Sequence, residues 1–422
     1  MDYEPRQQRH NTSCIETGDN TGLYNEKLNS PSCYDDDEDK KLRLPLESQD
    51  EGTRQTQYPQ TINNMSSPRC VARVDNHTMG NSLPRYLEIK VHQAILERVY
   101  DGITVIGLYN RSPPSIIFDG EKKGKPFNWQ RPAAQVIDNH LYIECFPGQD
   151  HIEHYAELIS TYLGIRQRLG DVLTPPSKVF YQRSTIPEIR HALHSTNLRD
   201  FPKNIDTVVL GHIDRMERLT GPLTWTSSGA FDWAIQSFGQ RQVAFLGCRF
   251  CYWGDLGGEV VHYLASQRGA REVIYQGKLG GIKKGVRPNS WLATGSRSYV
   301  HGRIVEWDNM LAESVAAAGQ AATIVGTHLT LSSVLHETKD WLASLPSDAD
   351  FVDPEIGMMA LAAKRNGIRF GYLHLISDNV AEKYEEDLSN ERTDSVLSRR
   401  VKLYEVVHDV LRHYLNSPPR TP

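Results

Sequence analysis

Residues 243–254 read VAFLGCRFCYWG, and this stretch is the best guide to the fold of the chain. Its first half is a short apolar run that ends in Gly247, the pattern of a strand buried on both faces. Two runs of the same kind lie on either side of it, TVVLG at 207–211 and EVIYQG at 272–277. Buried strands that alternate with helices along a chain are typical of an α/β domain.

The alternation of strands and helices continues almost to the end of the chain. Gly269 stands where a helix over 257–268 would end, because glycine is favoured just past a helix C-terminus. Further strands are expected at 321–326 and 369–376, and further helices at 356–366 and 398–415. We therefore predict an α/β domain over residues 205–416, in which helices cover both faces of the sheet.

The N-terminal half has a different organisation. Residues 1–84 are polar and carry an acidic run at 35–39, so they cannot bury enough apolar surface to offset the entropy of ordering. We expect a disordered tail there. Residues 85–204 indicate an α+β module whose function no motif identifies. Its strands are expected at 86–91 and 103–108, and its main helix at 151–169.

Composition and charge exclude several classes of partner. The net charge of −5 gives no general attraction to nucleic acid, and no apolar run has the roughly 18 to 20 residues of a membrane span. The first residues lack the apolar core of a secretory signal. The six cysteines are too scattered for a disulfide scaffold, which indicates a cytoplasmic setting. Cys248 and Cys251 lack a second pair, so we predict no metal site.

Polar residues stand at the expected carboxyl ends of the strands, where ligands bind in α/β folds. Arg249 follows one strand and is suited to bind phosphate with two parallel hydrogen bonds. Trp253, four residues later, is placed to stack on a ribose. The turn at 277–281 contains Lys278 among glycines, which leave backbone amides open to a ligand. Each of these features also occurs on ordinary protein surfaces and in ordinary tight turns.

Three acidic residues follow later strands. Glu337 is a candidate for hydrogen bonds to the edge of a nucleobase. Glu355 and Asp378 are separated by about one helix and one strand, so they can meet at one edge of the sheet. Carboxylates are costly to bring together unless they have partners or a function. The structural alternatives are that Glu355 complements a helix dipole and that Asp378 caps a helix.

Five segments, in this order, resemble the nucleoside phosphorylase and nucleosidase superfamily over about half of the chain. The superfamily includes purine nucleoside phosphorylases and methylthioadenosine nucleosidases. The resemblance implies a central mixed, twisted sheet covered by helices on both faces, and a homo-oligomer. The segments are the strand and arginine loop at 243–254, the glycine turn at 277–282, the segment at 326–338, Asp353-Pro354-Glu355 and Ile376-Ser377-Asp378.

The resemblance also implies a role for individual residues. Glu337 would contact the purine, Glu355 would hold the ribose hydroxyls, and Asp378 would protonate N7 of the leaving base. Arg249 would bind phosphate. The loop after the first strand offers Gly211 and Arg215 for the same anion, with a spacing similar to that of the hexameric phosphorylases. Lys278 stands where the family has a small residue, and we expect it to join the phosphate site.

These residues predict the cleavage of a purine-type nucleoside at its N-glycosidic bond. With Asp378 as the general acid and Glu355 on the sugar, inorganic phosphate would attack C1′, and no other cofactor would be needed. Phosphorolysis is the main expectation. A hydrolytic nucleosidase with the same acid and ribose contacts is the first alternative. A nucleoside-binding protein without catalysis is the second, and the phosphate dependence of base release separates the first two.

Overall fold

The structure is a computed structural model, and it describes residues 58, 65–69, 71–123, 126–213, 215–390 and 393–418. Contacts divide the chain into residues 1–60 and a compact unit from Thr61 to Pro422. A disordered tail is predicted for residues 1–84, and residues 1–57 of it lie outside the described residues. Its last residues belong to the compact unit, because Leu83 begins a helix and is fully buried.

A mixed sheet of 11 strands forms the centre of the described C-terminal half. Strands β8 and β15 run parallel through its middle, and the end of β8 pairs antiparallel with β14. The strands, in order along the chain, are β5 (Thr207–Gly211), β6 (Phe231–Phe238), β7 (Arg241–Cys248), β8 (Glu272–Gly281), β9 (Leu292–Thr294), β10 (Arg297–Val300), β11 (Arg303–Glu306), β12 (Thr323–Val325), β13 (Thr327–Thr330), β14 (Ala349–Asp353) and β15 (Arg369–Asn379).

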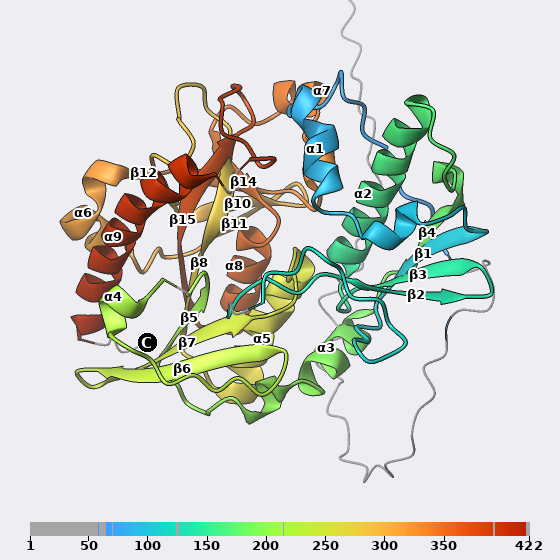
Figure 1. The fold of residues 1–422 in the computed structure, drawn as a ribbon. Helices are drawn as coiled ribbons and strands as arrows, with labels where there is room; N and C mark the ends of the chain where they lie inside the picture. The colour runs from blue at the N-terminus through green and yellow to red at the C-terminus, as the bar shows by residue number, and fades with distance from the viewer. Residues whose placement is uncertain are drawn as a thin grey trace, which may run out of the picture. The chain divides into compact units, whose positions relative to one another are not determined.

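Helices cover both faces of this sheet, as the sequence predicts (Figure 1). The long helix α9 (Asp394–Asn416) lies on one face, where Leu403, Val407 and Leu411 pack in one core with the strand residues Phe245 and Leu373. The opposite face holds the packed pair α5 (Asp255–Arg268) and α8 (Ile356–Arg365). The shorter helices are α4 (Glu217–Thr220), α6 (Ala312–Ala318) and α7 (Lys339–Ala343).

The N-terminal module contains a four-stranded sheet in the order β2-β3-β1-β4. The predicted strand at 103–108 is confirmed as β1 (Gly102–Ile106), and the predicted helix at 151–169 is confirmed as α2 (Gln149–Arg168). The strand predicted at 86–91 is wrong, because its first half, residues 86–88, forms the end of the helix α1 (Leu83–Glu88) and residues 89–91 form a turn. The other elements are β2 (Ala133–Ile137), β3 (His140–Glu144), β4 (Val179–Tyr181) and α3 (Ile186–His194). Among the described residues, we find no helix with the length and hydropathy that crossing a membrane requires.

The module and the large sheet are packed into one body through α2. Leu335, from the segment after β13, is buried in the hydrophobic core of the module. His154 of α2 lies 2.7 Å from the Ser333 hydroxyl, and Glu157 lies 3.0 Å from His336. The module therefore fixes the segment that carries Glu337.

The N-termini of α2 and α5 cap each other with exchanged aspartates. The Asp255 carboxylate accepts hydrogen bonds from the backbone amides of Gln149 and Asp150, at 3.0 and 3.1 Å. In return, the Asp150 carboxylate accepts one from the amide of Asp255 at 3.0 Å. Unpaired amides at helix N-termini favour such acceptors. These bonds connect the module directly to the loop that follows β7.

We expect this pair to make stability depend on pH. Burial, and then the charge of Asp150, raises the pKa of Asp255 from 3.8 to about 7. Between these values the folded chain keeps a proton that the unfolded chain has lost, so the stabilisation is complete below pH 3.8 and is lost as the pH rises towards 7. Asp255→Asn should remove much of this dependence. The thermal unfolding temperatures of the parent and the variant, compared from about pH 5 to about pH 8, measure this dependence. If the two temperatures differ by the same amount at every pH, Asp255 is not the source of the pH dependence.

Candidate functional site

Three of the predicted acidic residues converge in one cavity. Glu337, Glu355 and Asp378 all line a cavity of about 160 Å³ at the carboxyl ends of β8, β14 and β15. Trp253 and Lys278 line it as well. The five residues come from five segments that are far apart in the sequence, and the mixed sheet brings them together around one cavity. The cavity therefore brings together residues that the sequence analysis assigns to one site.

Two carboxyl groups lie together at one end of the cavity. A register shift in β15 between Ile376 and Asp378 turns the end of that strand, and the Ser377 hydroxyl donates to Asp378 Oδ1 at 2.7 Å. Burial, and then the charge of Asp378, raises the pKa of Glu337 well above its usual range. Glu337 Oε2 is buried without a hydrogen-bond partner among the described residues. A charge on Asp378 therefore disfavours a second charge on Glu337.

Glu355 lies just before α8, next to a second buried carboxylate. Asp353 Oδ1 accepts hydrogen bonds from the amides of Glu355 and Ile356, both at 2.9 Å, and so caps the helix. Burial, and then the charge of Asp353, raises the pKa of Glu355 well above its usual range. Tyr275 lines the same cavity as Glu355. A buried carboxyl in this setting gains strongly from hydroxyl donors, which a ribose supplies.

Asp353 belongs to a buried network that the sequence analysis does not identify. His328 Nε2 lies 2.9 Å from Asp353 Oδ1, and His374 Nε2 lies 3.7 Å from Asp353 Oδ2. Both imidazoles are completely buried. Burial lowers the pKa of His374 to about 4, so its ring is neutral near pH 7. These contacts hold Asp353, and through it the start of α8 and the backbone of Glu355.

Trp253 forms a rigid wall of the cavity. Its indole Nε1 donates to the Ser332 carbonyl at 2.6 Å. The imidazole of His154, from the module, stacks on the indole with ring centroids 4.2 Å apart and planes 7° from parallel. The ring is therefore held in one orientation, as stacking on a sugar or base would require.

The predicted phosphate residues do not all meet at this site. Arg249 turns away from the cavity, and its guanidinium forms a bidentate pair with Asp232 of β6 at 2.9 and 2.5 Å. Gly211 has a φ of +112°, and a side chain there would collide with the Gln276 carbonyl of β8, so close strand packing explains this glycine. Lys278 lines the cavity, and Arg215 lines a second cavity beside it.

The N-terminal module supplies part of the cavity, which no sequence motif reveals. Tyr86 and Lys90 line it from the end of α1, and Phe127 and Asn128 line it from a loop. That loop is bound to the strand end of β7, since the amide of Asn128 donates to the Cys248 carbonyl at 2.7 Å. A side chain at Gly247 would collide with the backbone of Pro126, so this glycine allows the close approach. His212, which also lines the cavity, is likewise missed by the sequence analysis.

Comparisons with known proteins were made for the sequence and for the structure. No family model matches the chain. The curated oxidoreductase cns1 of Cordyceps militaris is 24% identical over 176 residues, which cover 37% of this chain. The matching part spans only 21% of the length of that relative.

Among solved structures, the chain is similar to a putative methylthioadenosine nucleosidase from Weissella paramesenteroides, with 15% identity and a TM-score of 0.42 over 51% of this chain and 98% of that one. It is similar to the 5′-methylthioadenosine/S-adenosyl homocysteine nucleosidase of Campylobacter jejuni, with 13% identity and a TM-score of 0.40 over 50% and 100%. The futalosine hydrolase of Helicobacter pylori has 15% identity and a TM-score of 0.41 over 50% and 98%. These proteins are members of the superfamily that the five sequence segments resemble.

Proposed function

We propose that the chain cleaves the N-glycosidic bond of a purine-type nucleoside by hydrolysis. The observation that supports this most directly is the convergence of Glu337, Asp378 and Glu355 in one cavity. The first two form an acid pair suited to the leaving base. The third is placed beside them, where the sugar of the same nucleoside would lie. Trp253 supplies the flat wall for stacking.

In this proposal the C1′–N bond breaks towards a ribosyl cation. The proton held by the Glu337–Asp378 pair goes to N7 of the base, with Asp378 as the general acid. Glu355 binds the 2′ and 3′ hydroxyls and orients the sugar. A water oxygen bonds to C1′, and the proton that this water loses restores the acid pair. The products are the free base and ribose.

The position of Arg249 favours water over phosphate as the nucleophile. The phosphorolysis expected from the sequence depends on this guanidinium, and Asp232 already accepts both of its hydrogen bonds in the structure. Freeing it would leave the Asp232 carboxylate, which is almost fully buried, without its partner. Phosphorolysis remains the second candidate, since Lys278 lines the same cavity.

We expect purine nucleosides to release free base at the same rate with and without inorganic phosphate. Base release from a panel of nucleosides, in phosphate-free buffer and after phosphate is added, measures this directly. Ribose as the sugar product supports hydrolysis, and ribose 1-phosphate with a phosphate-dependent rate identifies a phosphorylase. Tight binding of a nucleoside without any release of base would support the nucleoside-binding protein instead.

A further inference from the structure

A second and larger cavity adjoins the proposed nucleoside site. It measures about 430 Å³. It shares Lys90, Phe127, Asn128, His212 and Lys278 with the first cavity, so the two spaces meet along these residues. The carboxyl groups of Glu337, Glu355 and Asp378 line only the first. A ligand that passes these shared side chains would reach from the acidic cavity into the second one.

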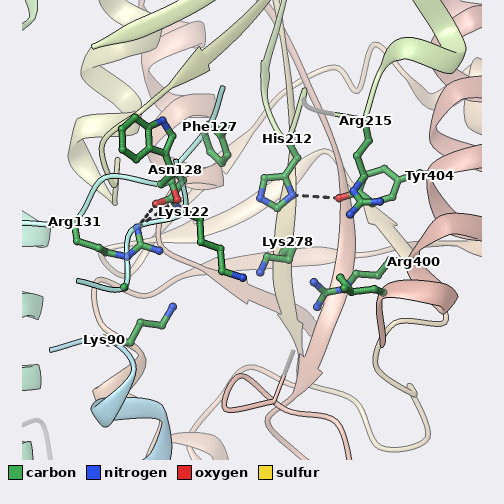
Figure 2. Close-up of a pocket in the computed structure, with 13 residues that line it drawn as sticks. Lys90, Lys122, Phe127, Asn128, Arg131, His212, Arg215, Lys278, Arg400 and Tyr404 are labelled. Carbon is green, nitrogen blue, oxygen red and sulfur yellow. Dashed lines mark hydrogen bonds between the residues drawn. The ribbon is translucent and has the colours of Figure 1, made fainter. Parts of the chain in front are cut away.

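The second cavity is strongly basic. Among its described lining residues there is no aspartate or glutamate, and six carry a positive charge. Figure 2 shows the ammonium groups of Lys90, Lys122 and Lys278 and the guanidinium of Arg400 pointing toward the space between them. The six are Lys90, Lys122, Arg131, Arg215, Lys278 and Arg400.

Neutral groups hold several of these cations in place. Arg131 donates to the side-chain oxygen of Asn128 at 2.8 Å, and Arg400 Nε donates to the side-chain oxygen of Asn289 at 2.7 Å. The Arg215 guanidinium lies over the Tyr404 ring at 5.3 Å from its centroid. Amide oxygens and aromatic rings orient a cation without cancelling its charge. These contacts orient cationic groups that line the cavity.

Separate parts of the chain bring these charges together. Lys90 follows α1, Lys278 lies in β8 and Arg400 lies in α9. Arg131 lies in the loop whose Asn128 and Trp129 amides donate to the Cys248 and Arg249 carbonyls, at 2.7 and 2.9 Å. Like charges around one cavity repel one another, and a bound polyanion offsets that repulsion. The folded unit thus has a built site for several negative charges.

We propose that this cavity binds the 5′-phosphates of the substrate, and that the chain acts on a purine nucleoside 5′-di- or triphosphate. The inference rests on the proposed function, because it places base and ribose in the acidic cavity. The base lies at Glu337 and Asp378, the ribose at Glu355 and Trp253, and the phosphate chain passes Lys278 into the basic cavity.

The size and charge of the cavity favour attached phosphates over one free phosphate ion. An orthophosphate ion has five heavy atoms and would fill a small part of 430 Å³. Six lining cations also exceed the charge of one phosphate ion and suit a chain of several phosphates better. The reaction at C1′ is unchanged: the C1′–N bond breaks, a water oxygen replaces the base, and the base takes the proton. The products are free base and ribose 5-di- or triphosphate.

The test compares adenosine and guanosine with their 5′-mono-, di- and triphosphates as substrates of the whole chain. We expect kcat/KM for base release to rise by on the order of 10²-fold or more from nucleoside to triphosphate, since each charge-assisted phosphate contact is worth about 10-fold or more. The gain should shrink as salt is added. The sugar product should retain all of its phosphates, because no phosphate bond is broken.

Neighbouring lysines provide a matched pair of variants. Lys122 and Lys123 are both exposed, and only Lys122 lines the basic cavity. Lys122→Met should lower the ratio of triphosphate to nucleoside kcat/KM by about 10-fold, which is the loss of one such contact. Lys123→Met should leave that ratio unchanged. Arg400 is buried, so the kinetics of Arg400→Met are compared with its thermal unfolding temperature, which shows whether the variant is still folded.

The outcomes separate this inference from the proposed function. Nucleosides cleaved as well as, or better than, their triphosphates would overturn the phosphate subsite and leave the nucleosidase standing. Base release that needs free phosphate would assign the cavity to that ion instead. If no base is released from any substrate, equilibrium binding decides. Binding of ATP that is tighter than that of adenosine and weakened in Lys122→Met supports the subsite, and equal binding of the two overturns it.

Discussion

Asp378→Asn should lower the turnover number for base release by on the order of 10²- to 10⁴-fold, the range that a general acid contributes. The reason is geometric. Asp378 and Glu337 line the same cavity, and in the proposed mechanism this pair supplies the proton that the leaving purine takes. An amide at position 378 keeps the size and the hydrogen bond from Ser377 but carries no acidic proton. Single-turnover release of base measures the chemical step directly.

A change of leaving group distinguishes an acid from a residue that only shapes the cavity. A nitrophenyl riboside loses a phenolate that needs no proton, so Asp378→Asn should cleave it almost as fast as the parent does. Asp409→Asn is a control, because Asp409 is exposed, lies outside the nucleoside cavity and pairs with Arg412 on the surface of α9. An equal fall on both substrates would assign Asp378 a structural role, and unchanged turnover of the nucleoside would remove it from the mechanism.

The sequence predicted the acidic half of the site because strand ends are local signals. Glu337 and Glu355 follow strands, and Asp378 lies at the end of one, and each strand can be recognised from its own residues. In α/β folds, polar residues at the carboxyl ends of strands commonly gather at one ligand site. The prediction that these residues share a cavity therefore needed only the order of the strands.

Arg249 shows what strand order alone cannot predict. Its partner Asp232 lies on β6, and the antiparallel register that sets Asp232 opposite Gly247 brings the carboxylate within reach of the guanidinium. Nothing in the residues around Arg249 indicates that register. The same limit applies to the basic cavity, since Lys90, Arg131 and Arg400 come from three segments that meet only in the folded unit.

The N-terminal module is part of the proposed site as well as a neighbour of it. It supplies Lys90 and Asn128 to both cavities, and His154 fixes the plane of Trp253. Its composition shows no chemical motif because its contribution is made by single residues at the ends of elements. Packing through α2 then determines where those residues lie.

Glu355→Ala should lower kcat/KM for ribosides by on the order of 10²-fold, because the hydroxyl hydrogen bonds to a buried carboxylate are each worth about 1.5–3 kcal/mol. The loss should be clearly smaller for 2′-deoxyribosides, which lack one of the two hydroxyls. Glu355→Gln keeps the volume of the side chain and should lose most of the same activity. Steady-state kinetics on matched ribosides and 2′-deoxyribosides measure both effects.

The pH dependence of stability provides a control for Glu355, because its carboxyl group is costly to ionise in the folded chain. The raised pKa of Glu355 means that its contribution to stability is present at low pH and is lost as the pH rises through the folded value. Glu355→Gln removes that loss, so the variant should unfold at the same or a higher temperature than the parent at alkaline pH. A variant that is less stable there and loses ribosides and 2′-deoxyribosides equally would show that Glu355 supports the fold and does not touch the sugar.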